Sequence, residues 1–134
     1  MRWLRPSIPT ARSCWPSRNN CDRVKVACLA QLVNVIGPIM TEPGGPAWRQ
    51  TIFHPFAQAA RFGHGRVLRP VIDSPAYEAK TFDEITYLCA SVVDDPESGR
   101  TAVFALNRHL EEEMELRVEL RGLGKNRRLE HALE

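Results

Sequence analysis

The stretch of sequence that decides the fold runs from Asp22 to Phe62 and reads DRVKVACLAQLVNVIGPIMTEPGGPAWRQTIFHPFAQAARF. Its first part, up to Ile36, is apolar on nearly every side of a helix, so a helix here would be buried on most faces. Asp22 is suited to cap the start of that helix, and Gly37-Pro38 stops it. The sequence therefore predicts a buried helix from Asp22 to Ile36.

A short strand and a second helix are predicted next. The apolar triplet Ile39–Thr41 predicts a very short buried strand, and the segment Glu42–Trp48, rich in proline and glycine, predicts a loop. Apolar residues then recur at helical spacing, which predicts a helix from about Gln50 to Phe62. Pro55 is tolerated only in a first turn, so we expect the regular helix to start late or to bend.

From Arg66 onward apolar residues recur at every second position, as in strands with one face toward solvent. The clearest run is 114–121, where Met, Leu, Val and Leu alternate with Glu and Arg. Alternation also predicts strands at 67–72, at 85–93 and around Phe104, and the segment DDPESG at 94–99 predicts the hairpin loop between the last two. Regularly spaced strands with turn signals predict an antiparallel β-sandwich.

The order of helix, short strand, loop and helix is that of the end of an α/β barrel. A (β/α)8 barrel repeats this unit around a closed ring, and this sequence holds about one of them. The predicted fold is mainly β with two N-terminal helices: the last β/α unit of a (β/α)8 barrel followed by an antiparallel β-sandwich, both incomplete. Residues 1–21 are interpreted as a disordered or out-of-frame leader (or a genuine flexible arm), 22–64 as the barrel unit and 65–134 as a truncated sandwich.

Two strings, DRVKVACLAQLVNVI from Asp22 and GPIMTEPGGPAWRQTIFHPFA from Gly37, resemble the α-L-arabinofuranosidases of glycoside hydrolase family 51. The resemblance continues through GRVLRP from Gly65 and FALNR from Phe104, and residues 1–18 lie outside it. It implies a (β/α)8 barrel followed by a C-terminal β-sandwich. The two predicted helices would flank the last barrel strand, in agreement with the reading from periodicity.

The resemblance also implies an activity. Family members are retaining glycosidases that remove non-reducing-end arabinofuranosyl residues from arabinose-containing oligosaccharides, which belongs to L-arabinose metabolism. A retaining glycosidase uses two carboxylic acids about 5–5.5 Å apart. In the family both are glutamates at the ends of earlier barrel strands, so they would precede Asp22. No catalytic residue is therefore assigned, and we expect the chain alone to be inactive.

Three residues are candidates for substrate binding. The resemblance aligns Gln50 with a glutamine that hydrogen-bonds the arabinose, and an amide can both donate and accept; the alternative is a capping amide at the helix start. Trp48 suits an apolar wall against the sugar, or simple packing between barrel and loop. Glu42 follows the predicted barrel strand at the end where barrel active sites form; the alternative is a loop or capping carboxylate.

Composition excludes several other classes. The chain has 134 residues and a formal net charge of +2, too small to indicate a nucleic-acid or membrane partner. Its four cysteines and four histidines lack the spacing of a metal site, so neither a metal nor another cofactor is predicted, and Cys28 and Cys89 are interpreted as buried thiols. The absence of a signal peptide and of a membrane span favours a cytoplasmic location.

Two other functions remain open on the sequence. One is a noncatalytic β-sandwich module that binds carbohydrate or a partner, although the aromatic residues do not form an exposed planar row. The other is a nonfunctional truncated reading frame, which the irregular first 18 residues favour. In every case the apolar helix pair would lack partners for residues such as Val26, Val33 and Ile52, so we expect self-association or a homo-oligomer.

Overall fold

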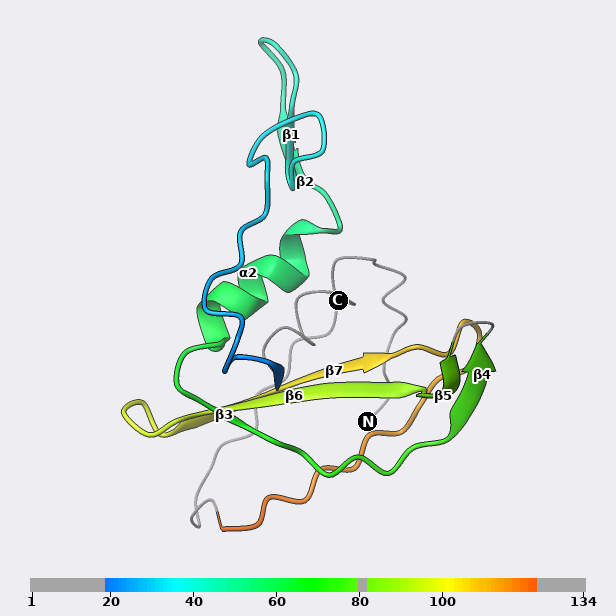
Figure 1. Cartoon of the computed structure of the whole chain (residues 1–134). Helices are drawn as coiled ribbons and strands as arrows, with labels where there is room; N and C mark the ends of the chain where they lie inside the picture. The colour runs from blue at the N-terminus through cyan, green and yellow to red at the C-terminus, as the bar shows by residue number, and fades with distance from the viewer. Residues whose placement is uncertain (1–18, 80–81, 123–134) are drawn as a thin grey trace.

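The computed structural model describes residues 19–79 and 82–122 (Figure 1). Nearly all of the predicted leader and the last residues of the predicted sandwich lie outside these ranges. The described chain is mainly β, with antiparallel sheets and one α-helix. In chain order the elements are β1 (Ile39–Thr41), β2 (Ala47–Arg49), α2 (Phe53–Phe62), β3 (Arg66–Leu68), β4 (Ala76–Ala79), β5 (Phe82–Thr86), β6 (Leu88–Asp95) and β7 (Arg100–Asn107).

A three-stranded sheet in the order β3-β6-β7 holds the core. The β6–β7 pairing extends along both strands, from Leu88 opposite Asn107 to Asp95 opposite Arg100, and forms the long hairpin across Figure 1. Along β7 the buried apolar residues Phe104 and Leu106 alternate with half-buried ones, as the sequence predicts, and the strand ends on the buried Asn107. The core consists of Val93, Phe104 and Leu106, with Val67, Cys89 and Ala102 packed against it.

This hairpin confirms the two predicted strands and the turn between them, but it does not confirm a simple alternation along β6. In the register of the hairpin, Ala90 lies opposite Ala105 and Ser91 lies opposite Phe104, so the core side chain of Phe104 shares a face with Ser91. The predicted run 85–93 is also divided, because β5 ends at Thr86 and β6 begins at Leu88. Along β6, buried residues occur on both faces of the strand, so its burial shows no simple alternation.

The second predicted helix is confirmed. Helix α2 begins at Phe53, so Pro55 lies in the first turn, where its missing N–H costs no helical hydrogen bond. Gly63 caps the other end by donating its backbone N–H to Ala59 O at 3.0 Å. The guanidinium of Arg49 lies 4.8 Å from the centre of the Phe53 ring, a cation–π contact that ties the end of β2 to the helix.

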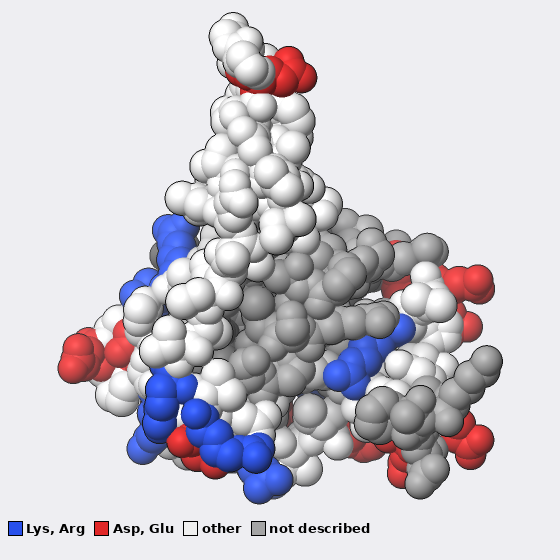
Figure 2. Space-filling view, turned by 45° about the horizontal axis from the view of Figure 1, so that its top comes forward, with Lys and Arg blue, Asp and Glu red and all other residues white. Residues whose placement is uncertain are grey.

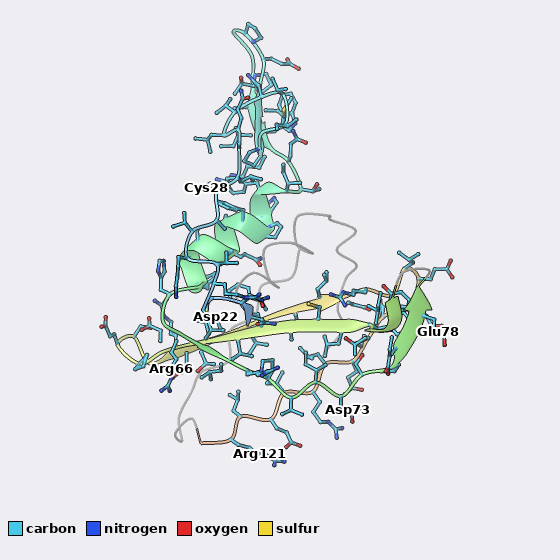
Figure 3. All side chains as sticks on the ribbon, in the orientation of Figure 1. Asp22, Cys28, Arg66, Asp73, Glu78 and Arg121 are labelled. Carbon is cyan, nitrogen blue, oxygen red and sulfur yellow. The ribbon has the colours of Figure 1, made fainter. Side chains whose placement is uncertain are left out.

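The first predicted helix, from Asp22 to Ile36, is wrong. After a turn at 20–23 the segment has no regular structure beyond a bridge between Val33 and Ile39. Figure 3 shows it as an extended chain that passes Asp22 and Cys28. Val26 and Val35 are 79% and 78% exposed, so the described chain offers them no packing surface.

The absence of a helix at 22–36 follows from the factors that stabilise helices. An apolar helix owes most of its stability to burial of its faces, and β-branched residues, which are frequent between Val24 and Ile36, lower its intrinsic propensity. Cys28 is exposed, which corrects the prediction of a buried thiol there, whereas Cys89 is half-buried against the core.

Two predicted strands differ from the structure. The run 67–72 is reduced to β3, since Pro70 cannot donate to a sheet. The run 114–121 has no strand at all: Met114 and Leu116 are half-buried, but Val118 and Leu120 are each 44% exposed. The alternating sequence of this run therefore half-buries two side chains, but the run forms no hydrogen-bonded pair with a neighbouring strand among the described residues.

The remaining strands, β4 and β5, pair antiparallel beside one end of the long hairpin (Figure 1). The ring of Tyr77 on β4 packs against Tyr87, and Tyr87 packs against His109, with centroids 4.9 Å and 4.8 Å apart. Among the described residues, no helix is both long and apolar enough to cross a membrane.

Candidate functional site

The β1–β2 hairpin carries all three candidate substrate-binding residues. The sequence predicts a strand followed by a loop, whereas the structure turns the loop back so that Met40 pairs with Trp48. Hydrogen bonds continue this ladder beyond both ends: Glu42 N donates to Pro46 O at 3.1 Å and Gln50 N donates to Pro38 O at 2.8 Å. Each proline lies where only its carbonyl is required, which suits a residue without an N–H.

This register brings the candidate residues to one face. Side chains of a strand alternate between its faces, and directly paired residues share a face. Glu42 lies two residues after Met40, and Gln50 lies two residues after Trp48, the partner of Met40. Glu42, Trp48 and Gln50 therefore lie along the same face of the hairpin, which we call the 42/48/50 face.

Gln50 is the best-positioned member of this face. Its side-chain amide donates from Nε2 to Gly37 O at 3.0 Å, and its backbone carbonyl accepts from Phe53 N at 2.9 Å. The side chain does not cap α2, whose first turn has no side-chain cap. An amide has two N–H donors and a carbonyl acceptor, so the bond to Gly37 orients the group and leaves capacity for a ligand hydroxyl.

Trp48 and Glu42 are open to solvent. The indole of Trp48 is 44% exposed on strand β2, a large apolar surface beside polar groups. Glu42 begins the tight turn of the hairpin: its carbonyl accepts from Gly45 N at 3.0 Å, and Gly44 has a φ of 68°, which favours glycine. In Figure 2 the hairpin is a projection with few charges and with acidic atoms near its end.

The arrangement combines an apolar ring, an oriented amide and a single carboxylate. This set can bind a sugar by stacking and hydrogen bonding, because polar groups that fix orientation beside an aromatic surface are typical of ligand sites. Among residues 19–79 and 82–122, no three His, Cys, Asp or Glu side chains are grouped to hold a metal ion.

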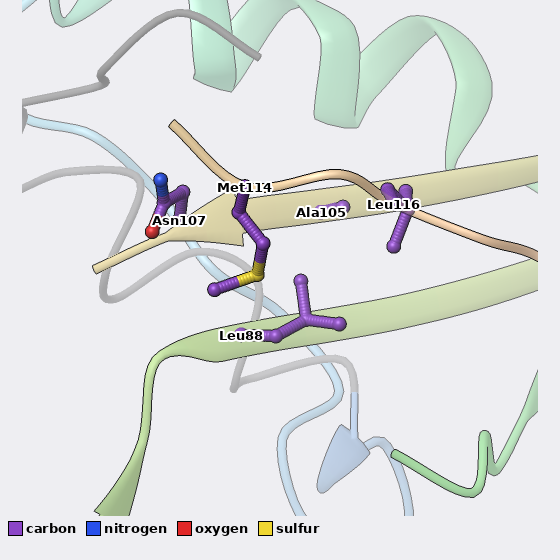
Figure 4. A pocket seen from close by; sticks show the side chains of 5 residues that line it. All are labelled: Leu88, Ala105, Asn107, Met114 and Leu116. Atoms are coloured by element: carbon purple, nitrogen blue, oxygen red, sulfur yellow. The ribbon is translucent and has the colours of Figure 1, made fainter. Parts of the chain in front are cut away.

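A second feature lies on the other side of the molecule and was missed from the sequence. Leu88, Ala105, Asn107, Met114 and Leu116 line a shallow apolar pocket on the β6–β7 hairpin (Figure 4). Its free volume of about 10 Å³ is close to that of a single water, so it is a packing defect rather than a ligand site. The alternation of apolar residues at 114–116 could have indicated a partly buried segment. Its position over the β6–β7 hairpin depends on the turn before it, which no local pattern predicts.

The described chain is a small, mainly β domain, and comparison with known proteins shows the family to which it belongs. Residues 17–133 match the family model described as the α-L-arabinofuranosidase C-terminal domain. The chain belongs to this family, that is, to the C-terminal portion of the family 51 α-L-arabinofuranosidases.

Individual relatives give the same result. The chain is 49% identical over 112 residues to an intracellular exo-α-(1→5)-L-arabinofuranosidase of Halalkalibacterium halodurans and 48% identical over 112 residues to one of Bacillus subtilis. Both alignments cover 84% of this chain and 22% of the relative. An exo-α-(1→6)-L-arabinofuranosidase of Bifidobacterium longum is 48% identical over 102 residues, covering 75% of this chain and 19% of the relative.

A solved structure extends the similarity to three dimensions. A family 51 α-L-arabinofuranosidase from Bifidobacterium longum superposes with a TM-score of 0.70 at 40% sequence identity. The match covers 74% of this chain and 19% of that chain. The chain thus spans about a fifth of the length of the proteins that it matches.

Proposed function

We propose that the chain is part of a retaining α-L-arabinofuranosidase that removes non-reducing-end arabinose from arabinose-containing oligosaccharides in the cytoplasm, as a step of L-arabinose metabolism. The names of its relatives, which are exo-acting arabinofuranosidases and several of them intracellular, support this proposal. The proposed bond is an α-L-arabinofuranosyl linkage in general, because the relatives include both (1→5) and (1→6) enzymes.

Within that enzyme, the 42/48/50 face contacts the sugar. The observation that carries this role is the register of the β1–β2 hairpin, which places Trp48 and Gln50 on one face although the sequence separates them into a loop and a helix start. Gln50 would exchange hydrogen bonds with sugar hydroxyls, Trp48 would pack against the apolar side of the ring, and Glu42 would bind a hydroxyl at the rim.

The bond-breaking groups lie elsewhere in this proposal. Retention requires a nucleophile and an acid/base, two carboxylates about 5–5.5 Å apart, and the 42/48/50 face presents the single carboxylate of Glu42. Both catalytic glutamates would come from the part of the family fold that precedes Asp22, and residues 22–64 would complete the barrel that holds them. The chain by itself would then bind sugar weakly and turn over no substrate.

The test is a full-length enzyme in which residues 22–122 of this chain replace the corresponding part of the Bacillus subtilis relative. We expect Gln50→Ala to lower kcat/KM for p-nitrophenyl α-L-arabinofuranoside by roughly 10- to 100-fold, the effect of about 1.4–2.7 kcal/mol of lost transition-state binding. Gln58→Ala is the matched control, since Gln58 is a half-buried glutamine within α2, outside the hairpin. Equal kinetics for the two variants would exclude Gln50 from the site.

One observation favours a partner-binding role in addition. The segment 24–36 exposes large apolar side chains, including Val26, Val35 and Ile36, and surfaces of this kind bind other polypeptides or associate with themselves. We propose that this segment mediates self-association of the chain when the rest of the barrel is absent.

A further inference from the structure

The turn that follows β7 is closed by side chains rather than by a ladder. Asn107 is buried and spans the turn: its Oδ1 accepts from His109 N at 2.9 Å and its Nδ2 donates to Glu112 O at 2.8 Å. The ring of His109 closes the same turn from inside, where Nδ1 accepts from Glu112 N at 2.8 Å and from Glu111 N at 3.3 Å.

These contacts require one protonation state of His109. A ring nitrogen accepts a hydrogen bond only when it carries no proton, so Nδ1 must be bare and the proton must lie on Nε2. A protonated imidazole has an N–H at both nitrogens. In that state Nδ1–H would face the N–H groups of Glu111 and Glu112, and both hydrogen bonds would be lost.

Two aromatic rings and one carboxylate lie beside the His109 ring. The Tyr87 ring packs on the His109 ring with their centroids 4.8 Å apart, and the Tyr77 ring lies beyond Tyr87. Glu112 Oε2 lies 3.7 Å from Nε2 and favours the imidazolium. Its side chain is 80% exposed, so solvent screens that attraction.

Three further charged side chains lie close to His109 in the sequence. The guanidinium of Arg108 is directed to Thr86 O, with Nη1 at 3.2 Å, and the side chains of Glu111 and Glu113 are exposed to solvent. A cation next in sequence disfavours a second positive charge on His109, whereas the exposed carboxylates favour it weakly.

The turn determines where the following residues lie. Met114 and Leu116 come directly after it and cover Leu88 and Ala105 on the β6–β7 hairpin (Figure 4). Residues 112–121 form no strand, so the described chain holds this cover through the turn and through side-chain packing. Loosening of the turn would free Met114 and Leu116 and expose the apolar surface beneath them.

We propose that His109 is a pH-sensitive latch: the neutral ring holds residues 110–116 on the β6–β7 hairpin, and protonation at Nδ1 releases them. Imidazole side chains change charge between about pH 5 and 8, so release accompanies mild acidification. The latch concerns a site apart from the 42/48/50 face and does not depend on the proposed enzymatic function.

Nitrogen NMR of the full chain tests this directly, together with amide hydrogen exchange between about pH 5 and 8, corrected for intrinsic rates. We expect the His109 ring to carry its proton on Nε2 at the upper pH. The Glu112 amide should lose about tenfold or more of its protection at the lower pH. A proton on Nδ1 at the upper pH, or a Glu112 amide with the same protection throughout, would overturn the proposal without any variant.

Two variants complete the test. His109→Asn keeps a side-chain acceptor able to reach backbone N–H groups two and three residues on, but does not titrate, so the protection of Glu112 should become independent of pH. His64→Asn removes an exposed histidine outside the turn and should leave the transition as it is. Persistence of the transition in His109→Asn would assign it to another group and contradict the latch.

Discussion

Gly65 shows how a single backbone position fixes the sheet. Its φ is +118°, and a Cβ there would overlap the carbonyl oxygen of Asp94 and lie 2.9 Å from the Cα of Asp95. All these atoms belong to the backbone of β6, which cannot move without breaking its pairing with β3 and β7. The residue therefore permits the close approach between the end of α2 and the central sheet.

We expect Gly65→Ala to lower the free energy of unfolding by about 3 kcal/mol, because strain and steric overlap add. Gly99→Ala is the matched control: its φ is +67°, and a Cβ there would meet nothing within 4 Å. That variant should cost only about 1 kcal/mol, the strain of the left-handed conformation. Urea denaturation measures both, and equal costs would show that the approach to β6 is not tight.

Ser91 is a position where a substitution should raise the stability of the fold instead of lowering it. Its side chain is fully buried on β6 opposite Phe104, and its Oγ has no hydrogen-bond partner among the described residues. A buried hydroxyl without a partner costs about 1–3 kcal/mol, so Ser91→Ala should raise stability by about 1 kcal/mol.

Thr101→Ala provides the comparison, because its hydroxyl donates to the buried carboxylate of Asp94 at 2.9 Å and its loss should destabilise. The two variants should shift the urea midpoint in opposite directions. A destabilised Ser91→Ala protein would mean that the hydroxyl has a partner in the folded chain.

At the scale of elements, the β6–β7 turn depends on an ionised carboxylate. The hydroxyl of Ser98 donates to Asp95 Oδ2, and the backbone N–H groups of Ser98 and Glu97 donate to Oδ1 at 3.3 Å and 3.1 Å. These bonds, led by the Ser98 hydroxyl, together with the nearby charge of Arg100, hold the pKa of Asp95 below its ordinary value of 3.8.

Since the folded turn favours the charged form, its contribution is complete above the ordinary pKa and is lost as the pH falls below it. NMR of the Ser98 amide should therefore show the turn loosening only below about pH 4, and Asp95→Asn should abolish that acid transition. A Ser98 amide that stays unchanged down to about pH 2 would contradict this role.

The sequence predicted those elements whose formation depends on residues close together in the chain. The β6–β7 hairpin follows from alternation and from the Pro-Glu-Ser-Gly turn, and α2 follows from apolar residues at helical spacing, with Pro55 in its first turn and Gly63 at its end. The β1–β2 hairpin was predicted only in part, because Ala47–Arg49 is too short to alternate and the Pro-Gly-Gly-Pro segment resembles a loop.

The candidate site was predicted as residues but not as an arrangement. That Glu42, Trp48 and Gln50 share a face follows from the register of β1 with β2, a long-range property that no local pattern encodes. The helix predicted at 22–36 is absent for a related reason. An apolar segment indicates that burial would stabilise a helix, but burial requires another part of the protein to pack against it.

At the scale of the whole molecule, the small core and the exposed apolar segment determine behaviour in solution. The fully buried apolar side chains cluster on the β6–β7 hairpin, whereas Val26, Val35 and Ile36 are 64–79% exposed. We expect the purified chain to self-associate, as measured by sedimentation velocity, and a Val26→Asp/Val35→Asp double variant to shift it toward monomer. A monodisperse wild-type chain that melts cooperatively would contradict this expectation.

We infer that this chain contributes sugar contacts through the 42/48/50 face and that the cleaving groups lie outside it. Hydrolysis of p-nitrophenyl α-L-arabinofuranoside by the purified chain, alongside its Gln50→Ala variant, tests where the cleaving groups lie. We expect no turnover above background for either protein. Turnover by the chain that disappears in Gln50→Ala would show a working active site within these residues and would contradict the claim.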